Sequence, residues 1–146
     1  MTLQPTSQII LVDDDEDDRL LIGSLLTQHC PGHTLRFAEN GQELLDLLNE
    51  PDGLPVSLIL LDLNMPVLGG FDTLRYLKGE GTQRSTPVVV LTTSEEPDDI
   101  NRSYALGANA FLTKPAGHAD LRTMVLQLRD FWLKLVRLPN GTPPKP

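Results

Sequence analysis

The chain alternates short, nearly continuous apolar runs with longer segments in which apolar residues recur at helical spacing. A run that is apolar at almost every position is typical of a strand in a parallel sheet, because such a strand is covered on both faces. The apolar runs predict strands at Gln8–Asp13, Thr34–Ala38, Ser57–Asp62, Val88–Leu91 and Ala110–Thr113.

Helical periodicity fills the intervals between these runs. Turn and cap residues agree with it, since Asn40-Gly41 resembles a helix start and Gly107 follows a helix end. The pattern predicts helices at about Asp15–His29, Gln42–Glu50, Phe71–Lys78, Pro97–Leu106 and His118–Leu138. Alternating strand–helix units of this kind predict an α/β fold, a doubly wound five-stranded parallel sheet with helices on both faces.

The length of 146 residues suits a single domain with a substantial core. We expect this domain to span residues 8–138, preceded by an N-terminal extension at residues 1–7. Residues 139–146 contain four prolines and one glycine, so we expect a flexible, proline-rich tail there. No internal repeat and no second domain is visible in the pattern.

Charge and cysteine content narrow the possible functions. The net charge is −8. No basic stripe is present to replace counterions on phosphates, which argues against a nucleic-acid partner. Cys30 is the only cysteine, so the sequence offers no disulfide framework and fits a reducing, cytoplasmic compartment. No apolar run approaches the ~18 residues that a membrane span needs, and the start of the chain does not resemble a signal peptide.

An acidic run, Asp13 to Asp18, follows the first predicted strand directly. Such a run is usually a solvated face, but here the fold would hold it at the end of a buried strand. Two like charges about 4 Å apart repel by about 4 kcal/mol at an effective dielectric near 20. A divalent cation offsets this repulsion, and oxygen ligands suit Mg²⁺ or Mn²⁺. The sequence therefore predicts a metal site.

Polar side chains also follow the other predicted strands. Asp62 ends the third strand, Thr92 follows the fourth, and Lys114 follows the fifth. Doubly wound sheets bind ligands beyond the carboxyl ends of their strands. Each of these residues alone is more often a cap or a solvated charge, but together they predict one functional site.

The ordered set of these segments resembles the signature of two-component response-regulator receiver domains, over roughly Gln8 to Leu133. The matching segments are Val12-Asp13-Asp14-Asp15, Leu61-Asp62-Leu63-Asn64-Met65-Pro66, Leu91-Thr92-Thr93-Ser94 and Leu112-Thr113-Lys114-Pro115. The resemblance implies the flavodoxin-like fold of that family and a Mg²⁺-dependent phosphoryl transfer from a sensor histidine kinase.

The resemblance also implies roles for individual residues. Asp62 corresponds to the phosphoacceptor. Asp13 and Asp14 correspond to the acidic pair that holds Mg²⁺ (or Mn²⁺), and the backbone carbonyl of Asn64 corresponds to a further ligand of that ion. Thr92 corresponds to the switch hydroxyl and Phe111 to the switch aromatic. Lys114 corresponds to the phosphoryl-binding lysine. The bond between Lys114 and Pro115 is where the family usually has a cis peptide.

The chemistry explains these residue types. A carboxylate of Asp62 can attack a phosphoryl group in line once the charge of the donor is screened. Lys114 supplies a point charge to one phosphoryl oxygen, and the Thr92 hydroxyl donates to another. Such a protein assists its own phosphorylation but turns over no external substrate, so we expect a signalling protein rather than an enzyme.

Three alternatives remain open at this stage. A haloacid-dehalogenase-like phosphatase also uses a nucleophilic aspartate, but it needs an acid two residues later, where this chain has Asn64. A flavodoxin-like cofactor binder would place phosphate against the carboxylates after Val12, which repel it. An inactive receiver could serve as a docking module, although Asp62, Thr92 and Lys114 argue against that.

The last predicted helix bears on output and partners. Its main apolar stripe, which we assign to the core, is Leu121, Met124, Val125, Leu128, Trp132 and Leu135. Leu126 and Leu133 point off that stripe, and with Phe131 they predict an interface through which the chain forms a homodimer. Because only this helix and the tail follow the fifth strand, we expect no DNA-binding output domain.

The segment Asp130-Phe131-Trp132-Leu133, together with Leu60-Leu61-Asp62-Leu63-Asn64 and Val90-Leu91-Thr92-Thr93-Ser94, resembles the stand-alone receivers that are paired with bacterial and cyanobacterial phytochrome kinases. By this resemblance the phosphoryl donor would be a phosphohistidine on a phytochrome histidine kinase.

Overall fold

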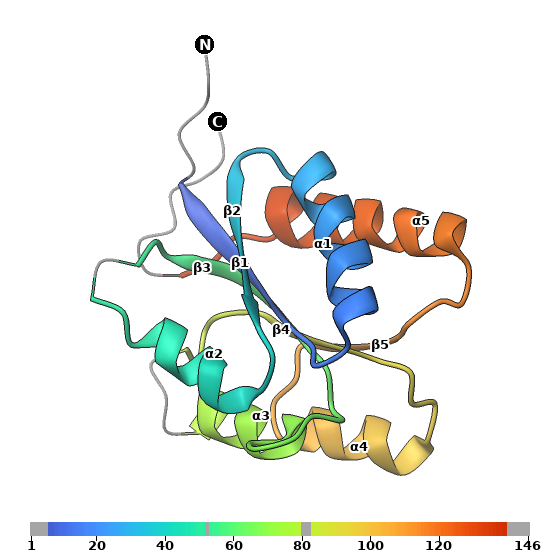
Figure 1. The fold of residues 1–146 in the computed structure, drawn as a ribbon. Helices are drawn as coiled ribbons and strands as arrows, with labels where there is room; N and C mark the ends of the chain where they lie inside the picture. Colours follow the sequence, from blue (N-terminus) through green and yellow to red (C-terminus); the bar gives the residue numbers. More distant parts are fainter. Residues whose placement is uncertain (1–5, 52, 80–82, 140–146) are drawn as a thin grey trace.

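Parallel strands form the centre of the fold, and helices cover both faces of the sheet (Figure 1). This computed structural model describes residues 6–51, 53–79 and 83–139. The sheet has five strands in the order β2-β1-β3-β4-β5. They are β1 (Ser7–Val12), β2 (His33–Ala38), β3 (Val56–Leu61), β4 (Val88–Thr92) and β5 (Ala110–Thr113). The doubly wound α/β fold predicted from the sequence is confirmed.

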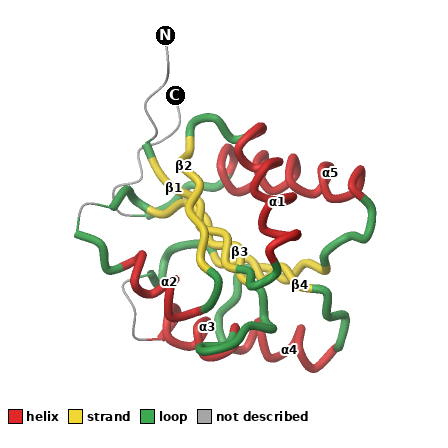
Figure 2. The backbone as a smooth tube through the Cα atoms, viewed as in Figure 1, coloured by secondary structure: helices red, strands yellow, loops and turns green. Residues whose placement is uncertain are grey.

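The helices divide into two layers (Figures 1 and 2). One layer consists of α1 (Glu16–His29) and α5 (His118–Leu128), and the other of α2 (Gly41–Leu48), α3 (Gly70–Gly79) and α4 (Pro97–Ala105). Caps begin the first two helices, because Asp15 accepts a hydrogen bond from the Asp18 N–H and Asn40 accepts one from the Glu43 N–H. No described helix is long and apolar enough to cross a membrane.

Each strand contributes to two hydrophobic cores, one under each helical layer. In β1, Ile9 and Leu11 pack toward α1 and α5, whereas Ile10 and Val12 pack toward α2 and α3. All four side chains are at most 1% exposed. Burying a side chain of this size contributes about 1.5–3 kcal/mol, so the continuous apolar runs hold the strand ends, and the polar residues that follow them, in fixed positions.

The last helix departs from the prediction. The α-helix ends at Leu128, and a π-helical segment, η1 (Arg129–Leu135), continues the chain. Backbone hydrogen bonds in a π-helix span five residues instead of the four of an α-helix, so each turn holds more residues. Leu133, five residues after Leu128, is therefore buried at 5% exposure, whereas Leu135 is 71% exposed. The predicted positions of Leu133 off the core stripe and Leu135 within it are both wrong.

The ends of the domain and one loop also differ from expectation. Ser7, expected in the N-terminal extension, is the first residue of β1, while residues 1–5 of that extension lie outside the described residues. The predicted tail likewise lies outside them beyond Pro139. No cis peptide bond occurs in the described parts of the chain. The cis bond expected between Lys114 and Pro115 is therefore not found.

Candidate functional site

Two aspartates continue the backbone ladder of the sheet past the ends of their strands. The N–H of Asp13 donates to the Ala38 carbonyl, and the N–H of Asp62 donates to the Val12 carbonyl, each at 3.0 Å. Because β1 and β3 are neighbours in the sheet, both carboxylates emerge at the same edge. They are nearly buried, with Asp13 1% and Asp62 7% exposed.

Lys114 reaches the same edge from the end of β5. Its backbone N–H donates to the Thr92 carbonyl at 2.7 Å, which fixes the position of the chain there. Its ammonium lies 2.6 Å from Asp13 Oδ2, 2.8 Å from Asp18 Oδ2 and 3.8 Å from Asp62 Oδ2. Burial alone would lower the pKa of Lys114, but the hydrogen bonds to Asp13 and Asp18 and the charge of Asp62 outweigh it and raise the pKa. The lysine is a permanent positive charge.

The environment of Asp62, unlike that of Lys114, disfavours the charged form of the side chain. Burial raises the pKa of its carboxyl above the ordinary value, and the charge of Asp13 adds to that rise. The charge of Lys114, the Thr92 side chain and the Asn64 backbone each favour the ionised form and lower the pKa, but burial is the larger effect. Asp62 is thus a carboxylate with poor solvation, which favours nucleophilic attack.

The carboxylates form a group that fits a divalent cation. One oxygen each of Asp13, Asp14 and Asp62 lies within 4.8 Å of the others, and such a set of hard oxygen donors suits Mg²⁺ or Mn²⁺. Asp13 already uses both oxygens, one for the Asp15 N–H at 2.9 Å and one for Lys114. Asp14 is exposed and has no hydrogen bond or ion pair within the described structure, so it is the carboxylate most available to a metal. The carbonyl of Asn64 stays a predicted ligand.

The two predicted switch residues lie beside this group. Thr92 is fully buried at the end of β4, and its side chain favours the ionised form of Asp62. Phe111 is partly buried against the core that β1 shares with α2 and α3. Its backbone N–H donates to the hydroxyl of Tyr104 in α4 at 3.1 Å. The two predicted switch residues thus lie on paired strands, β4 and β5, and Phe111 connects β5 to α4.

Glycines allow the loop after Asp62 to pack closely. A Cβ on Gly70 would lie 2.5 Å from the Asp62 carbonyl oxygen, and one on Gly41 would lie 2.6 Å from the Leu68 carbonyl oxygen. The N–H of Gly41 donates to that same Leu68 carbonyl at 3.0 Å. Within this tightly held loop, Val67 has a φ of 59°, a left-handed conformation that is strained for a β-branched residue.

We compared the amino-acid sequence with models of known protein families. Residues 9–126 match the model of the response regulator receiver domain. The chain belongs to this family.

Several receivers of known structure are similar over nearly the whole chain. Response regulator Rcp1 of Synechocystis sp. is 37% identical over 139 residues, which are 92% of this chain and 95% of Rcp1. Its Mn²⁺-bound crystal structure aligns with a TM-score of 0.83 at 36% identity, covering 92% of this chain and 99% of that one. The phosphorylated cyanobacterial phytochrome response regulator RcpA aligns with a TM-score of 0.84, also at 36% identity and with the same coverage.

A third receiver is a response regulator in red light signaling of R. palustris. It is 32% identical and aligns with a TM-score of 0.79, covering 92% of this chain and 99% of its own.

The sequence pattern did not predict that two further residues, Asp18 and Arg19, belong to this receiver's site. Asp18 pairs with Lys114, and Arg19 donates from Nη1 to the Asp13 carbonyl at 3.0 Å while its Nη2 lies 3.2 Å from a Glu39 oxygen. Their position offered a signal. Asp18 lies in the first turn of the helix that follows the acidic pair, and Arg19 is the first cation after the acidic run.

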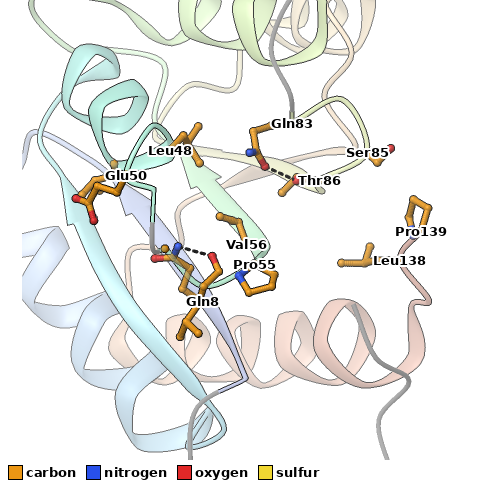
Figure 3. A pocket seen from close by; sticks show the side chains of 13 residues that line it. Gln8, Leu48, Glu50, Pro55, Val56, Gln83, Ser85, Thr86, Leu138 and Pro139 are labelled. Carbon is orange, nitrogen blue, oxygen red and sulfur yellow. Dashed lines mark hydrogen bonds between the residues drawn. The ribbon is translucent and has the colours of Figure 1, made fainter. Parts of the chain in front are cut away.

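The receiver also has a cavity far from this cluster, of about 340 Å³. It lies at the amino ends of β1 and β3, whereas the aspartates follow the carboxyl ends (Figure 3). Gln8 donates there to the Leu54 carbonyl at 2.7 Å, and Thr86 donates to the Gln83 side chain at 2.7 Å. Among the described residues that line it, Glu50 is the only charged one. The cavity has no part in the chemistry of the aspartates.

Proposed function

We propose that this receiver accepts a phosphoryl group onto Asp62 from a phosphohistidine of a sensor histidine kinase. The observation that carries the proposal is the convergence of a poorly solvated carboxylate, Asp62, with an acidic pair and a permanently charged lysine at one edge of the sheet. Phosphoryl transfer needs a nucleophile, charge neutralisation and positioning, and each of these residues supplies one of them.

The residues of the chain have separable tasks. The Asp62 carboxylate attacks phosphorus in line, and burial leaves it few hydrogen bonds to water that oppose the attack. Lys114 places its charge 3.8 Å from Asp62 Oδ2, where it attracts an oxygen of the incoming phosphoryl group. The Thr92 hydroxyl faces the same carboxylate and donates to another phosphoryl oxygen.

A divalent cation held by Asp14 and Asp62, with Asp13 acting through its charge or through water, would screen the negative charge that the two reactants bring together. We propose Mg²⁺ or Mn²⁺ for this role, with the Asn64 carbonyl as a further ligand. The relative Rcp1 has been crystallised in an Mn²⁺-bound form, which supports the choice of ion.

A phytochrome histidine kinase is the proposed donor. The similar protein RcpA is a cyanobacterial phytochrome response regulator, and another similar receiver acts in red light signaling. The proposal therefore makes this chain a signalling protein that assists its own phosphorylation and has no external substrate.

The signal would leave through the surface near Thr92 and Phe111 and through the last helix. A phosphoryl group on Asp62 draws the Thr92 hydroxyl toward it, and Phe111 then moves toward the space that Thr92 leaves. We propose that this change acts on a homodimer formed by the last helix, with Leu126 and the half-exposed Phe131 at its interface. Leu133 is buried within the protomer, and the exposed Leu135 takes its place there.

The phosphorylation proposal is tested with acetyl phosphate as donor and intact-mass measurement. Wild type with Mg²⁺ should gain one phosphoryl group, and Asp62→Asn should gain none. Omitting the metal should abolish the gain in wild type. A wild type that stays unmodified with Mg²⁺ present would identify the chain as an inactive docking module.

The donor proposal has its own test, because phosphotransfer can be followed from purified, phosphorylated histidine kinases. A phytochrome kinase should transfer its label to this receiver at least tenfold faster than an unrelated histidine kinase does. Equal rates would contradict the pairing without affecting the role of Asp62.

The dimer is tested by sedimentation. Phe131→Glu combined with Leu135→Glu should produce a monomer, whereas the control Leu20→Glu, an exposed leucine of α1 that is 63% accessible, should sediment like wild type. A double variant that associates like wild type contradicts an interface at the last helix.

A further inference from the structure

Lys114 is hydrogen-bonded to two carboxylates, and neither of them is Asp62. Its ammonium lies 2.6 Å from Asp13 and 2.8 Å from Asp18, but 3.8 Å from Asp62. A lysine ammonium has three donors. Two of them are therefore used by Asp13 and Asp18 in the resting protein.

Asp18 is held in place by the first turn of α1. Its backbone N–H donates to Asp15 Oδ1 at 2.9 Å, while its side chain reaches across 96 residues of sequence to Lys114. Acidic residues are common in the first helical turn because they interact favourably with the helix dipole. That explains an acid at this position, but it does not explain why the carboxylate contacts the phosphoryl-binding lysine.

The contact of Asp18 differs from that of Asp13. Asp13 is buried and belongs to the group of carboxylates that fits a metal, whereas Asp18 lies outside that group and its side chain is 37% exposed. Asp18 can therefore be changed without the loss of a metal ligand. The Asn64, Thr92 and Asp14 positions are likewise left intact by such a change.

We propose that Asp18 is a positioning residue that acts through Lys114 and lowers the affinity of the site for a phosphoryl group. This inference rests on the proposed phosphorylation of Asp62. The Asp18 carboxylate competes with the phosphoryl oxygens for the ammonium, and its negative charge repels them. Because Asp13 alone still holds Lys114 at 2.6 Å, loss of Asp18 frees one donor without freeing the lysine.

The solvent exposure of Asp18 limits the size of the effect. A fully buried charge a few ångströms from a phosphoryl group would change affinity by orders of magnitude, but exposed pairs are screened and contribute little. We expect removal of this charge to tighten binding of a phosphoryl mimic by about fivefold, which is the scale of a partly screened interaction. A weak effect of this size adjusts the fraction of phosphorylated protein without abolishing the response.

The test measures binding of beryllofluoride, a phosphoryl mimic, by fluorine NMR at saturating Mg²⁺. The variants are Asp18→Asn, which keeps the shape but removes the charge, and Asp18→Glu, which keeps the charge. The matched control is Asp17→Asn, an exposed acid of the same helical turn. Thermal melting of each variant checks that the fold is retained.

We expect Asp18→Asn to bind about fivefold more tightly than wild type, with Asp18→Glu and Asp17→Asn both close to wild type. Equal tightening by Asp17→Asn would overturn the inference, because it would show a general effect of net charge. Unchanged or weaker binding by Asp18→Asn would also overturn it. If wild type itself binds no beryllofluoride, the proposed function fails and not merely this inference.

Discussion

At the scale of single residues, Asp62 combines two opposed requirements. A nucleophilic carboxylate must be ionised, yet burial raises its pKa and makes the ionised form costly. When the folded-state pKa is raised, the folded protein binds the proton more tightly than the unfolded chain does. Stability therefore falls as pH rises through the interval between the two pKa values. The phosphoacceptor thus destabilises the metal-free fold at neutral pH.

This cost predicts the behaviour of Asp62→Asn in EDTA. At pH 7 the variant should melt at a higher temperature than wild type, because the amide has no ionised form. The difference should shrink as the pH falls toward about 4, the ordinary pKa of aspartate, because the cost disappears once the carboxyl is protonated in both the folded and the unfolded states. Melting curves across this range test the prediction, and a variant that is less stable than wild type at neutral pH contradicts it.

The acidic pair has a division of labour that can be measured. Asp14 has no other partner in the described structure, whereas Asp13 is buried and bonded to Lys114. Asp14→Ala should weaken Mg²⁺ binding about tenfold or more with little change in melting temperature. Asp13→Ala should mainly destabilise the fold, because it removes one partner of a buried ion pair. Calorimetric Mg²⁺ titration and thermal melting separate the two effects, and the reverse pattern would count against this geometry.

Val67 has a left-handed backbone in the loop that follows Asp62. A left-handed conformation costs an L-residue roughly 1–2 kcal/mol, and the 72% exposure of this side chain means that little burial offsets it. Val67→Asn should stabilise the protein by about 1 kcal/mol, or about 3 °C in Tm, because asparagine tolerates this conformation. The β-branched control Val67→Thr should show no such gain. Equal stability of the two variants would exclude backbone strain at this position.

At the scale of elements, the strands were predictable and the last helix was not. A strand that is buried on both faces is recognised in the sequence as a continuous apolar run bounded by turn residues. For β5 this pattern predicted the bounds that the structure has. The π-helical segment leaves no such pattern. The leucines at 126, 128, 133 and 135 are compatible with a continuous α-helix in the sequence pattern. Only the packing of the helix against the core decides which of these side chains is buried.

The change of pitch makes a prediction about two neighbouring leucines. Leu133→Ala should destabilise the protein by about 2–4 kcal/mol, because it leaves a cavity in the core under α1 and α5. Leu135→Ala should change the free energy of unfolding by less than about 0.5 kcal/mol, as exposed positions usually do. Urea denaturation of both variants tests this. A larger loss of stability in Leu135→Ala than in Leu133→Ala would show that the last helix keeps α-helical pitch.

At the scale of the whole molecule, the parallel sheet explains why most of the site was predictable. The carboxyl ends of parallel strands meet at one edge, so Asp13, Asp62 and Lys114 had to converge once the strands were assigned. The pairing of Asp18 with Lys114 could not be predicted in this way. It depends on how α1 is rotated against the loop after β5, and that rotation is set by side-chain packing between distant segments.

The central claim is that this convergence makes Asp62, and no other acid, the phosphoacceptor. Its most direct test is to phosphorylate the full chain with acetyl phosphate and Mg²⁺, reduce the acyl phosphate with borohydride, and map the resulting homoserine by peptide mass spectrometry. The convergence of these side chains on Asp62 predicts homoserine at position 62 alone. Homoserine at Asp13 or Asp14, with Asp62 unmodified, would contradict it.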